Sequence, residues 1–492
     1  MDRSSGASAP RDSWRMRVAS LAAGALPVLT FPRPSLSWLA WVVLVPGLVL
    51  MRSAPTVRAA AVRGWWFGGG YLFAALYWTL PNIGPGLVLV ALVFGAMWTT
   101  WGAAARWLPP PAALVALPCV WVAIEFARSW PRLGGPWALL GASQWSHPTV
   151  LSLAALGGVW LVSLVLVAVN TAVALALLSS KHRAALLAFA VALVAAGPVA
   201  YVVRSEPPTA RTFRVALVQP GVVRGPAARL TEGEHITRQV PRVDLIVWGE
   251  SSVGYDVARA HDVAARLRAL AATAPLLVNE DARDARGRIS KSTILLRPDG
   301  IGERYVKTRL VPFGEYIPFR SAFGWLASIS EAAAEDRVPG TGVTVMPVSR
   351  GGVVAGPLIC FESSFPDLGR AVTRRGADVL VYQSSTSSFQ ESWAPPQHAS
   401  LAAVRAAETG RPAVQAALTG VSAAFDARGR RLAWFDTDRR GFTVAALRTP
   451  PPGSRTPYDR FGDYVAHLAV GVTAVTALTA VAAAVRRRTG RP

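Results

Sequence analysis

The sequence predicts a bundle of membrane-spanning α-helices joined to an α/β domain. Of its 492 residues, 52% are hydrophobic and only 16% are charged, and long runs are nearly free of charge. Each helical crossing of a bilayer needs about 20 mostly apolar residues. The second half of the chain instead alternates short β-like runs with helical stretches, which is typical of an α/β domain.

Seven crossings are predicted before residue 205 and an eighth near the C-terminus. Their approximate ranges are 16–31, 36–52, 64–80, 86–106, 112–128, 150–179, 184–203 and 465–485. Pro27, Pro46 and Pro118 interrupt the first, second and fifth runs, which neighbouring helices can tolerate. The first run starts like a secretory signal, but the crossings behind it favour an uncleaved helix.

The distribution of basic residues orients this bundle. With the N-terminus in the cytoplasm, the inside segments carry fourteen lysines and arginines, whereas the short outside segments carry four. Both termini are therefore expected inside, with residues 205–463 outside. The predicted domains are a bundle at 1–204, an outer domain at 205–462, and a final helix with a basic tail at 463–492. Much of the net charge of +22 is explained by basic residues that orient the helices and attract the lipid bilayer. No nucleic-acid partner is therefore expected.

The outer region, about 211–455, is large enough for its own core. Predicted strands lie at 215–219, 245–250, 275–280, 292–297, 352–362, 378–383 and 412–418. Predicted helices lie at 256–273, 368–377 and 400–410.

Three chemically capable side chains follow β-like runs in this region. Glu250 follows LIVW and a glycine, Lys307 follows ERYV, and Cys360 follows VVAGPLI. Singly, each has an ordinary explanation, as a small buried thiol or as a solvated charge. Together they would form a nucleophilic acyl-transfer site, in which a carboxylate deprotonates the thiol and an ammonium stabilises the oxyanion.

Cysteine usage agrees with this interpretation. The chain has two cysteines, Cys119 in an apolar membrane run and Cys360 in the outer domain. An oxidising compartment normally favours paired cysteines. A single thiol there therefore favours a nucleophile over a structural residue.

The order and spacing of Glu250, Lys307 and Cys360 resemble the Glu-Lys-Cys triad of the nitrilase superfamily, which implies an αββα sandwich. The bundle stretch EFARSWPRLGGPWALLGASQ, residues 125–144, resembles a hallmark of the apolipoprotein N-acyltransferases. PFGEYIPFR, ICFES, PPQH, ETGRP and TPYDRFGDY are similar to that family as well. The resemblance spans nearly the whole chain.

The resemblance implies the last step of lipoprotein maturation in the inner membrane of a bacterium. An acyl chain would pass from a membrane phospholipid, through a thioester on Cys360, to the α-amine of the N-terminal diacylglyceryl-cysteine of a lipoprotein. Glu250 would be the base, and Lys307 with the Phe361 N–H would stabilise the oxyanion. Glu315 would position Lys307 and the base. No metal or cofactor is expected.

Several polar residues have two interpretations. Glu362 is either support for the site or a buried hydrogen-bonded partner. His398, in a predicted turn at PPQH, is expected to be structural. Glu125 and Arg128 form either an i, i+3 ion pair or a contact to a lipid headgroup. Arg405 and Glu408 are expected to form a structural pair.

A lipid-dipping lid is predicted just after the lysine motif. Its residues are Phe319, Phe323, Trp325, Leu326 and Ile329, apolar side chains at irregular spacing in a domain that faces a bilayer.

The chain also departs from the family pattern. Ser385-Thr386-Ser387-Ser388-Phe389-Gln390 stands where the family usually has Asn-Asp-Ala-Trp-Phe-Gly, and Phe361 replaces a tyrosine. This leaves the acyl-chain and headgroup preference open.

Two other function classes are weighed against the acyltransferase. A membrane-tethered amidase or hydrolase would use the same triad, but a small soluble substrate needs neither the bundle motif nor an apolar lid. A transporter or scaffold is disfavoured because the bundle lacks clustered ionisable residues at mid-membrane, apart from Glu125 near one end.

Overall fold

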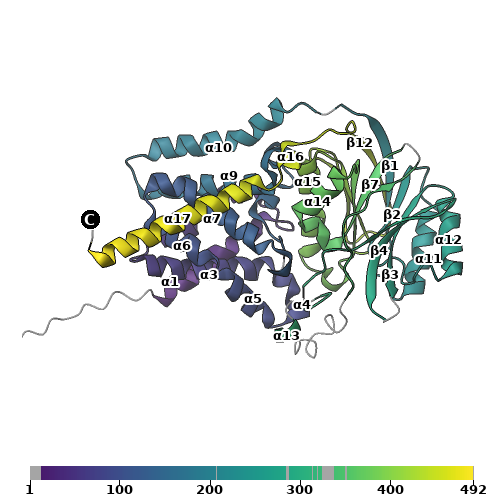
Figure 1. Ribbon diagram of the computed structural model, residues 1–492, viewed down its shortest axis with the longest axis horizontal. Helices are drawn as coiled ribbons and strands as arrows, with labels where there is room; N and C mark the ends of the chain where they lie inside the picture. Colours follow the sequence, from purple (N-terminus) through teal and green to yellow (C-terminus); the bar gives the residue numbers. More distant parts are fainter. Residues whose placement is uncertain are drawn as a thin grey trace, which may run out of the picture.

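A helical bundle and an α/β sandwich lie side by side in the computed structural model (Figure 1). The structure describes residues 13–133, 135–206, 208–283, 287–312, 314–317, 320–323, 337–349 and 352–490. The main helices of the bundle are α1 (Trp14–Ala25), α2 (Val45–Arg52), α3 (Val57–Ala75), α5 (Gly86–Gly95), α6 (Trp98–Trp107), α7 (Pro110–Arg128), α9 (Ala154–Leu178), α10 (Arg183–Val203) and α17 (Tyr464–Thr489).

Five helices in the described part of the chain are long and apolar enough to cross a membrane. They are Gly86–Trp107, which joins α5 and α6, Pro110–Arg128, Ala154–Leu178, Arg183–Val203 and Tyr464–Arg486. These five match the fourth to eighth predicted crossings.

The first three predicted crossings coincide with helical segments that do not meet this criterion. The first is α1 followed by η1 (Leu26–Thr30), and the second is η2 (Ser37–Trp41) followed by α2. The prolines at the starts of η1 and α2 explain why each run is broken. The third, α3, starts at Val57, seven residues before the predicted crossing at 64, because Thr56 caps it by accepting a hydrogen bond from the Ala59 N–H.

Small residues let the bundle helices approach closely. A Cβ atom added to Gly64 of α3 would lie only 2.3 Å from the carbonyl oxygen of Trp98 in α6. Such backbone-to-backbone contact is typical of helix packing in membranes.

The sandwich consists of two six-stranded sheets, ordered β12-β1-β2-β3-β4-β5 and β11-β10-β9-β8-β7-β6. The first contains β1 (Arg211–Gln219), β2 (Leu245–Trp248), β3 (Leu276–Arg283), β4 (Ile289–Arg297), β5 (Gly300–Val306) and β12 (Gly441–Thr449). The second contains β6 (Met346–Pro347), β7 (Val354–Ile359), β8 (Val379–Ser384), β9 (Ala413–Ala417), β10 (Ser422–Phe425) and β11 (Arg431–Phe435).

Alternate residues of the strands face opposite layers. In β1, Val215 and Leu217 belong to the large apolar core that continues through the second sheet to the bundle, whereas Ala216 and Val218 pack in a separate core. The helices α11 (Pro226–Thr237) and α12 (His261–Ala271) cover the outer face of the first sheet. The helices α14 (Pro366–Arg374) and α15 (Ala394–Thr409) lie between the second sheet and the bundle (Figure 1). These four layers confirm the predicted αββα sandwich.

Two predicted helix boundaries are wrong. The helix predicted to begin at 256 begins at His261, because Ala260, with φ −89° and ψ 81°, has a non-helical backbone conformation. The helix predicted to begin at 400 begins at Ala394. Its two prolines occupy the first turn, where a missing N–H costs nothing, so PPQH is helical rather than a turn.

Candidate active site

Strand ends bring Glu250, Lys307 and Cys360 together. Glu250 and Lys307 follow β2 and β5, which run in the same direction in the first sheet, and Cys360 follows β7 of the facing sheet. Lys307 Nζ lies 3.4 Å from Glu250 Oε1. The Glu250 carboxylate also interacts with Cys360, because, besides burial, its charge raises the pKa of the thiol. The carboxylate therefore faces both the thiol and the ammonium.

The backbone at Cys360 is strained. Its φ is +52°, in the left-handed region where a non-glycine residue costs on the order of 1–3 kcal/mol. The residue forms the sharp turn between β7 and the short helix η8 (Cys360–Ser364). Phe361 is next in the first turn of η8, where leading N–H groups have no acceptor within the helix. A donor for an oxyanion thus stands beside the thiol.

A second carboxylate, Glu315, holds the other side of Lys307. Glu315 Oε1 accepts from Lys307 Nζ at 2.9 Å and from Arg337 Nη1 at 3.0 Å. Its Oε2 atom accepts from the Val311 N–H at 3.0 Å. Lys307 is 1% exposed, so its ammonium is held in place by two buried carboxylates.

Glu362 is a fully buried hydrogen-bonded partner. Its carboxylate accepts from the Ile359 N–H at 2.7 Å, the Thr308 N–H at 2.7 Å, the Arg309 N–H at 2.9 Å and the Tyr305 hydroxyl at 2.8 Å. These bonds tie the cysteine turn to the loop that follows Lys307. These contacts fit both interpretations, because Glu362 is a buried hydrogen-bonded partner that also links two loops of the candidate site.

The charges of the site set its resting protonation state. Burial opposes ionisation of Glu250, but the Lys291 and Lys307 ammoniums outweigh it, so the pKa of Glu250 lies well below its usual value. Burial, together with the Glu250 charge, raises the pKa of Cys360 to about 12. Burial would lower the pKa of Lys307, but Glu315 and Glu250 hold it well above its usual value. At neutral pH the site therefore holds a carboxylate, an ammonium and a neutral thiol.

Two contacts to Glu250 went unpredicted. Lys291 Nζ lies 3.2 Å from Glu250 Oε1, and the Ser385 N–H donates to Oε2 at 3.1 Å. A backbone donor leaves no signal in a sequence. Lys291 does leave a signal, because it is one of only three lysines in the chain.

His398 lies on α15 with its ring buried. Its Nδ1 atom is 2.9 Å from Gln415 Oε1, and its ring lies 6.2 Å from that of Trp137. Burial lowers the pKa of His398, which favours a neutral ring packed against the bundle.

The bundle motif reaches the cysteine turn. Glu125 Oε1 accepts from the Leu140 N–H at 2.7 Å, and Arg128 Nη1 donates to the Trp137 carbonyl at 2.6 Å. Both side chains thus hold the loop after α7. A Cβ atom on Gly135, whose φ is +78°, would lie 2.7 Å from the Phe361 ring, so glycine is required where this loop meets the site.

Aromatic side chains from the bundle and the sandwich meet near this loop. Trp78 packs against Phe389 at 4.8 Å and against Trp137 at 5.0 Å between ring centroids, and Tyr77 packs against Trp393 at 5.2 Å. Phe389 belongs to the segment that departs from the family pattern. An aromatic wall is therefore present at the junction despite that departure.

Most of the predicted lid lies outside the described residues. This applies to Phe319, Trp325, Leu326 and Ile329, and for Phe323 only the backbone is described, at the end of α13 (Arg320–Phe323). Elsewhere in the described chain, Arg405 Nε pairs with Glu408 Oε2 at 3.2 Å, as expected. Glu408 also accepts from the Val159 N–H at 2.8 Å, joining α15 to α9.

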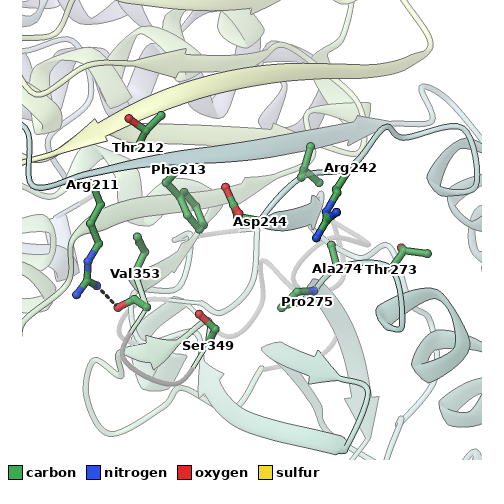
Figure 2. A pocket seen from close by; sticks show the side chains of 12 residues that line it. Arg211, Thr212, Phe213, Arg242, Asp244, Thr273, Ala274, Pro275, Ser349 and Val353 are labelled. Carbon is green, nitrogen blue, oxygen red and sulfur yellow. Dashed lines mark hydrogen bonds between the residues drawn. The ribbon is translucent and has the colours of Figure 1, made fainter.

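A cavity of about 560 Å³ lies elsewhere in the sandwich (Figure 2). Arg211, Phe213, Asp244 and Pro275 are among its lining residues, and they lie at or before the first residues of β1, β2 and β3. Glu250 follows the last residue of β2, so this cavity is at the opposite end of the strands. In the described residues, no cluster of three or more His, Cys, Asp or Glu side chains could hold a metal ion.

Comparison with known proteins accounts for both parts of the chain. Residues 190–450 match the family model described as carbon-nitrogen hydrolase, and residues 23–172 match the apolipoprotein N-acyltransferase N-terminal domain. The α/β domain is thus of the nitrilase class. Together with the relatives described next, these matches show that the chain belongs to the apolipoprotein N-acyltransferase family.

Two relatives illustrate the similarity. The apolipoprotein N-acyltransferase of Pseudomonas putida is 31% identical over 85% of this chain and 88% of its own length. That of Geobacter metallireducens is 29% identical over 96% of both. Among solved structures, Nit3 of Saccharomyces cerevisiae, a member of the nitrilase superfamily, aligns over 50% of this chain and 92% of its own at 19% identity. The TM-score of this alignment is 0.37.

Proposed function

We propose that Cys360 carries an acyl group between a membrane phospholipid and the α-amine of a lipoprotein's N-terminal diacylglyceryl-cysteine. Membership of the family makes the chain an acyltransferase that N-acylates lipoproteins and acts with membrane lipids. The observation that supports Cys360 as the acyl carrier is the position of one buried carboxylate, Glu250, where it pairs with Lys307 and its charge acts on the thiol. Family membership also favours this function over a tethered hydrolase, a transporter or a scaffold.

In the first half of the reaction, Glu250 removes the thiol proton as the sulfur attacks the ester carbonyl. The Lys307 ammonium and the Phe361 N–H stabilise the tetrahedral oxyanion. When the oxyanion collapses, the C–O bond breaks and Glu250 returns the proton to the leaving lysophospholipid alkoxide. A thioester remains on Cys360.

In the second half, the lipoprotein α-amine attacks the thioester and Glu250 accepts its proton. Collapse breaks the C–S bond, forms the amide, and leaves a thiolate that recovers the proton from Glu250. Glu315 serves as a positioning residue throughout, because it holds the Lys307 ammonium 2.9 Å from its own oxygen. An amide forms from an ester downhill, so the scheme needs no ATP or metal.

Mass spectrometry of lipoprotein N-termini tests this function. In bacterial cells that depend on this chain for N-acylation, wild type should give triacylated lipoproteins, and cells without it should accumulate the diacylated form. Lipoproteins that are triacylated equally in both strains would contradict the proposal.

We further propose that the catalytic domain is periplasmic and that both termini are cytoplasmic. Arg52 Nη1 donates to the Ala105 carbonyl and Arg106 Nε donates to the Ala54 carbonyl, both at 2.8 Å, so two basic loops gather at one end of the bundle. Tyr77, near the other end of α3, accepts from the Trp393 N–H of the sandwich at 2.9 Å. The C-terminus also lies at the end away from the sandwich (Figure 1).

Reporter fusions should separate the two ends. Fusions at about residue 300 and at the C-terminus are expected to report opposite sides of the membrane, because the basic loops remain in the cytoplasm. A periplasm-active reporter and a cytoplasm-active reporter at each site provide mutual controls. Signals from the same side at both sites would contradict the proposed orientation.

A further inference from the structure

Lys291 is a second buried ammonium on the proposed base. It lies on β4 directly opposite Asp281 of β3, and it is 7% exposed. Its Nζ atom is 3.2 Å from Glu250 Oε1 and 3.3 Å from Asp281 Oδ1, and it donates a hydrogen bond to the Ser251 hydroxyl. Asp281 and Ser251 therefore hold the Lys291 ammonium beside one oxygen of Glu250.

The composition of the chain makes this placement informative. Of 51 lysines and arginines, only Lys181, Lys291 and Lys307 are lysines. Two of these three contact the same oxygen of Glu250, at 3.2 and 3.4 Å. An ammonium is a compact point charge with three donors, whereas a guanidinium is a wide planar fork. Nearly all basic residues of this chain are arginines, but lysines occupy the two positions where cations meet at Glu250 Oε1.

The two lysines are also neighbours through the backbone. The Lys307 N–H donates to the Lys291 carbonyl at 2.9 Å, so the pairing of β4 with β5 fixes both side chains relative to Glu250. The charged and titratable groups that face Glu250 come from several elements, and they are Lys291, Lys307, Arg337, Cys360 and His398. Asp281 and Glu315 stand behind the two lysines.

We propose that Lys291 is a positioning residue that fixes Glu250 Oε1 and strengthens protonated Glu250 as the acid for the leaving alkoxide. The inference rests on the proposed role of Glu250 as the proton carrier, and it adds a residue to the Glu-Lys-Cys set.

The reaction explains why a second cation is useful. Glu250 must take a proton from the thiol and then give it to the alkoxide. A cation beside the carboxylate stabilises its charged form only, so it makes the protonated form release its proton more readily. Lys307 is shared with Glu315 and with the oxyanion, whereas Lys291 is shared only between Glu250 and Asp281, which has no role in the proposed scheme. Asp281 holds Lys291 from the opposite side and limits its movement.

The test is the pH dependence of thioester formation on Cys360. Purified full-length protein in detergent is mixed with a phospholipid that carries a fluorescent acyl chain, and the rate of acyl-enzyme formation is followed from about pH 5 to 8. In wild type, Glu250 stays ionised over this range, so we expect no loss of rate on the acid side. In Lys291→Met the pKa of Glu250 should rise, so the rate at pH 5 should fall below the rate at pH 7, by about tenfold for each unit by which that pKa exceeds 5.

Two further variants separate tuning from simple structural support. Asp281→Asn breaks the same cross-strand pair but leaves the cation on Glu250, so its rate can fall but its acid side should stay flat. Lys181→Met removes the exposed third lysine and should match wild type throughout. If Lys291→Met does not fold, as judged by thermal unfolding, Lys291→Gln replaces it with the same expectation.

The outcomes distinguish this inference from the proposed function. A neutral Lys291 variant that loses rate equally at every pH, or an acid-side loss that appears equally in Asp281→Asn, would overturn the tuning role. Wild type that never acquires the fluorescent acyl group at Cys360 would instead overturn the proposed acyl carrier itself. An acid-side loss confined to the neutral Lys291 variants supports the inference.

Discussion

Cys360→Ser is expected to abolish acyl transfer. A serine hydroxyl is far less acidic than a thiol, and the pKa of Glu250 is held low by Lys291 and Lys307 against the cost of burial, so Glu250 is too weak a base to activate a hydroxyl. We expect the rate to fall by at least about 1,000-fold, consistent with removal of an activated nucleophile. Intact-protein mass spectrometry after incubation with phospholipid should show one added acyl chain on wild type and none on the variant.

Cys119→Ser is the matched control for this experiment. Cys119 is the other cysteine of the chain, buried within α7, and it has no role in the proposed scheme. This variant should keep nearly all of the transfer activity. An acyl adduct that persists in Cys360→Ser and disappears in Cys119→Ser would place the thioester on the wrong residue and contradict the scheme.

The sequence predicted strands at the positions of β1 to β4 and β7 to β9, and it did not predict β10, β11 or β12. LIVW and VLVYQ are short apolar runs rich in β-branched residues, a pattern typical of buried parallel strands. SAAF of β10 and the exposed, arginine-bearing β11 lack that pattern. They are strands because cross-strand pairing with β9 and β10 satisfies their backbones, and such pairing is a tertiary property.

The candidate site divides in the same way. Cys360, Lys307 and Glu250 could be predicted because each ends a recognisable run. The contacts around them depend on which strands become neighbours: Lys291 meets Glu250 only because β4 lies between β3 and β5. The hydrogen bonds of Glu362 could likewise not be predicted, because they depend on where the loop after Lys307 lies. The residues of the candidate site could therefore be identified from local sequence, whereas the contacts that surround them could not.

The membrane boundary shows a further limit. Hydropathy located the five long helices, but the first three segments combine apolar residues with prolines or arginines that break or dilute the pattern. Arg63 of α3 is buried, 5% exposed, and donates to the Leu50 carbonyl. A buried arginine with a hydrogen-bond partner lowers the mean hydropathy of its helix although the helix stays packed in the bundle. Hydropathy alone therefore does not decide whether such a helix lies in the membrane.

Lys307→Met is expected to remove activity and also to destabilise the folded protein. The substitution deletes the ammonium that stabilises the oxyanion and leaves the Glu250 and Glu315 carboxylates buried with one partner fewer. Removing one member of a buried ion pair typically costs about 3–5 kcal/mol. Arg337 on Glu315 and Lys291 on Glu250 remain, so we expect the lower end of that range, measured by thermal unfolding in detergent.

A second substitution separates the catalytic effect from the effect on stability. The double variant Lys307→Met, Glu315→Gln also neutralises the Glu315 carboxylate, which has lost its partner Lys307. Its unfolding temperature should therefore lie between those of Lys307→Met and wild type. Acyl-enzyme formation should not return, because the oxyanion still lacks its ammonium. Glu315→Gln alone should destabilise the protein less than Lys307→Met, because Lys307 keeps its ion pair with Glu250. If the double variant recovered activity together with stability, Lys307 would act only by balancing buried charge, and the oxyanion would have to be stabilised by the backbone alone.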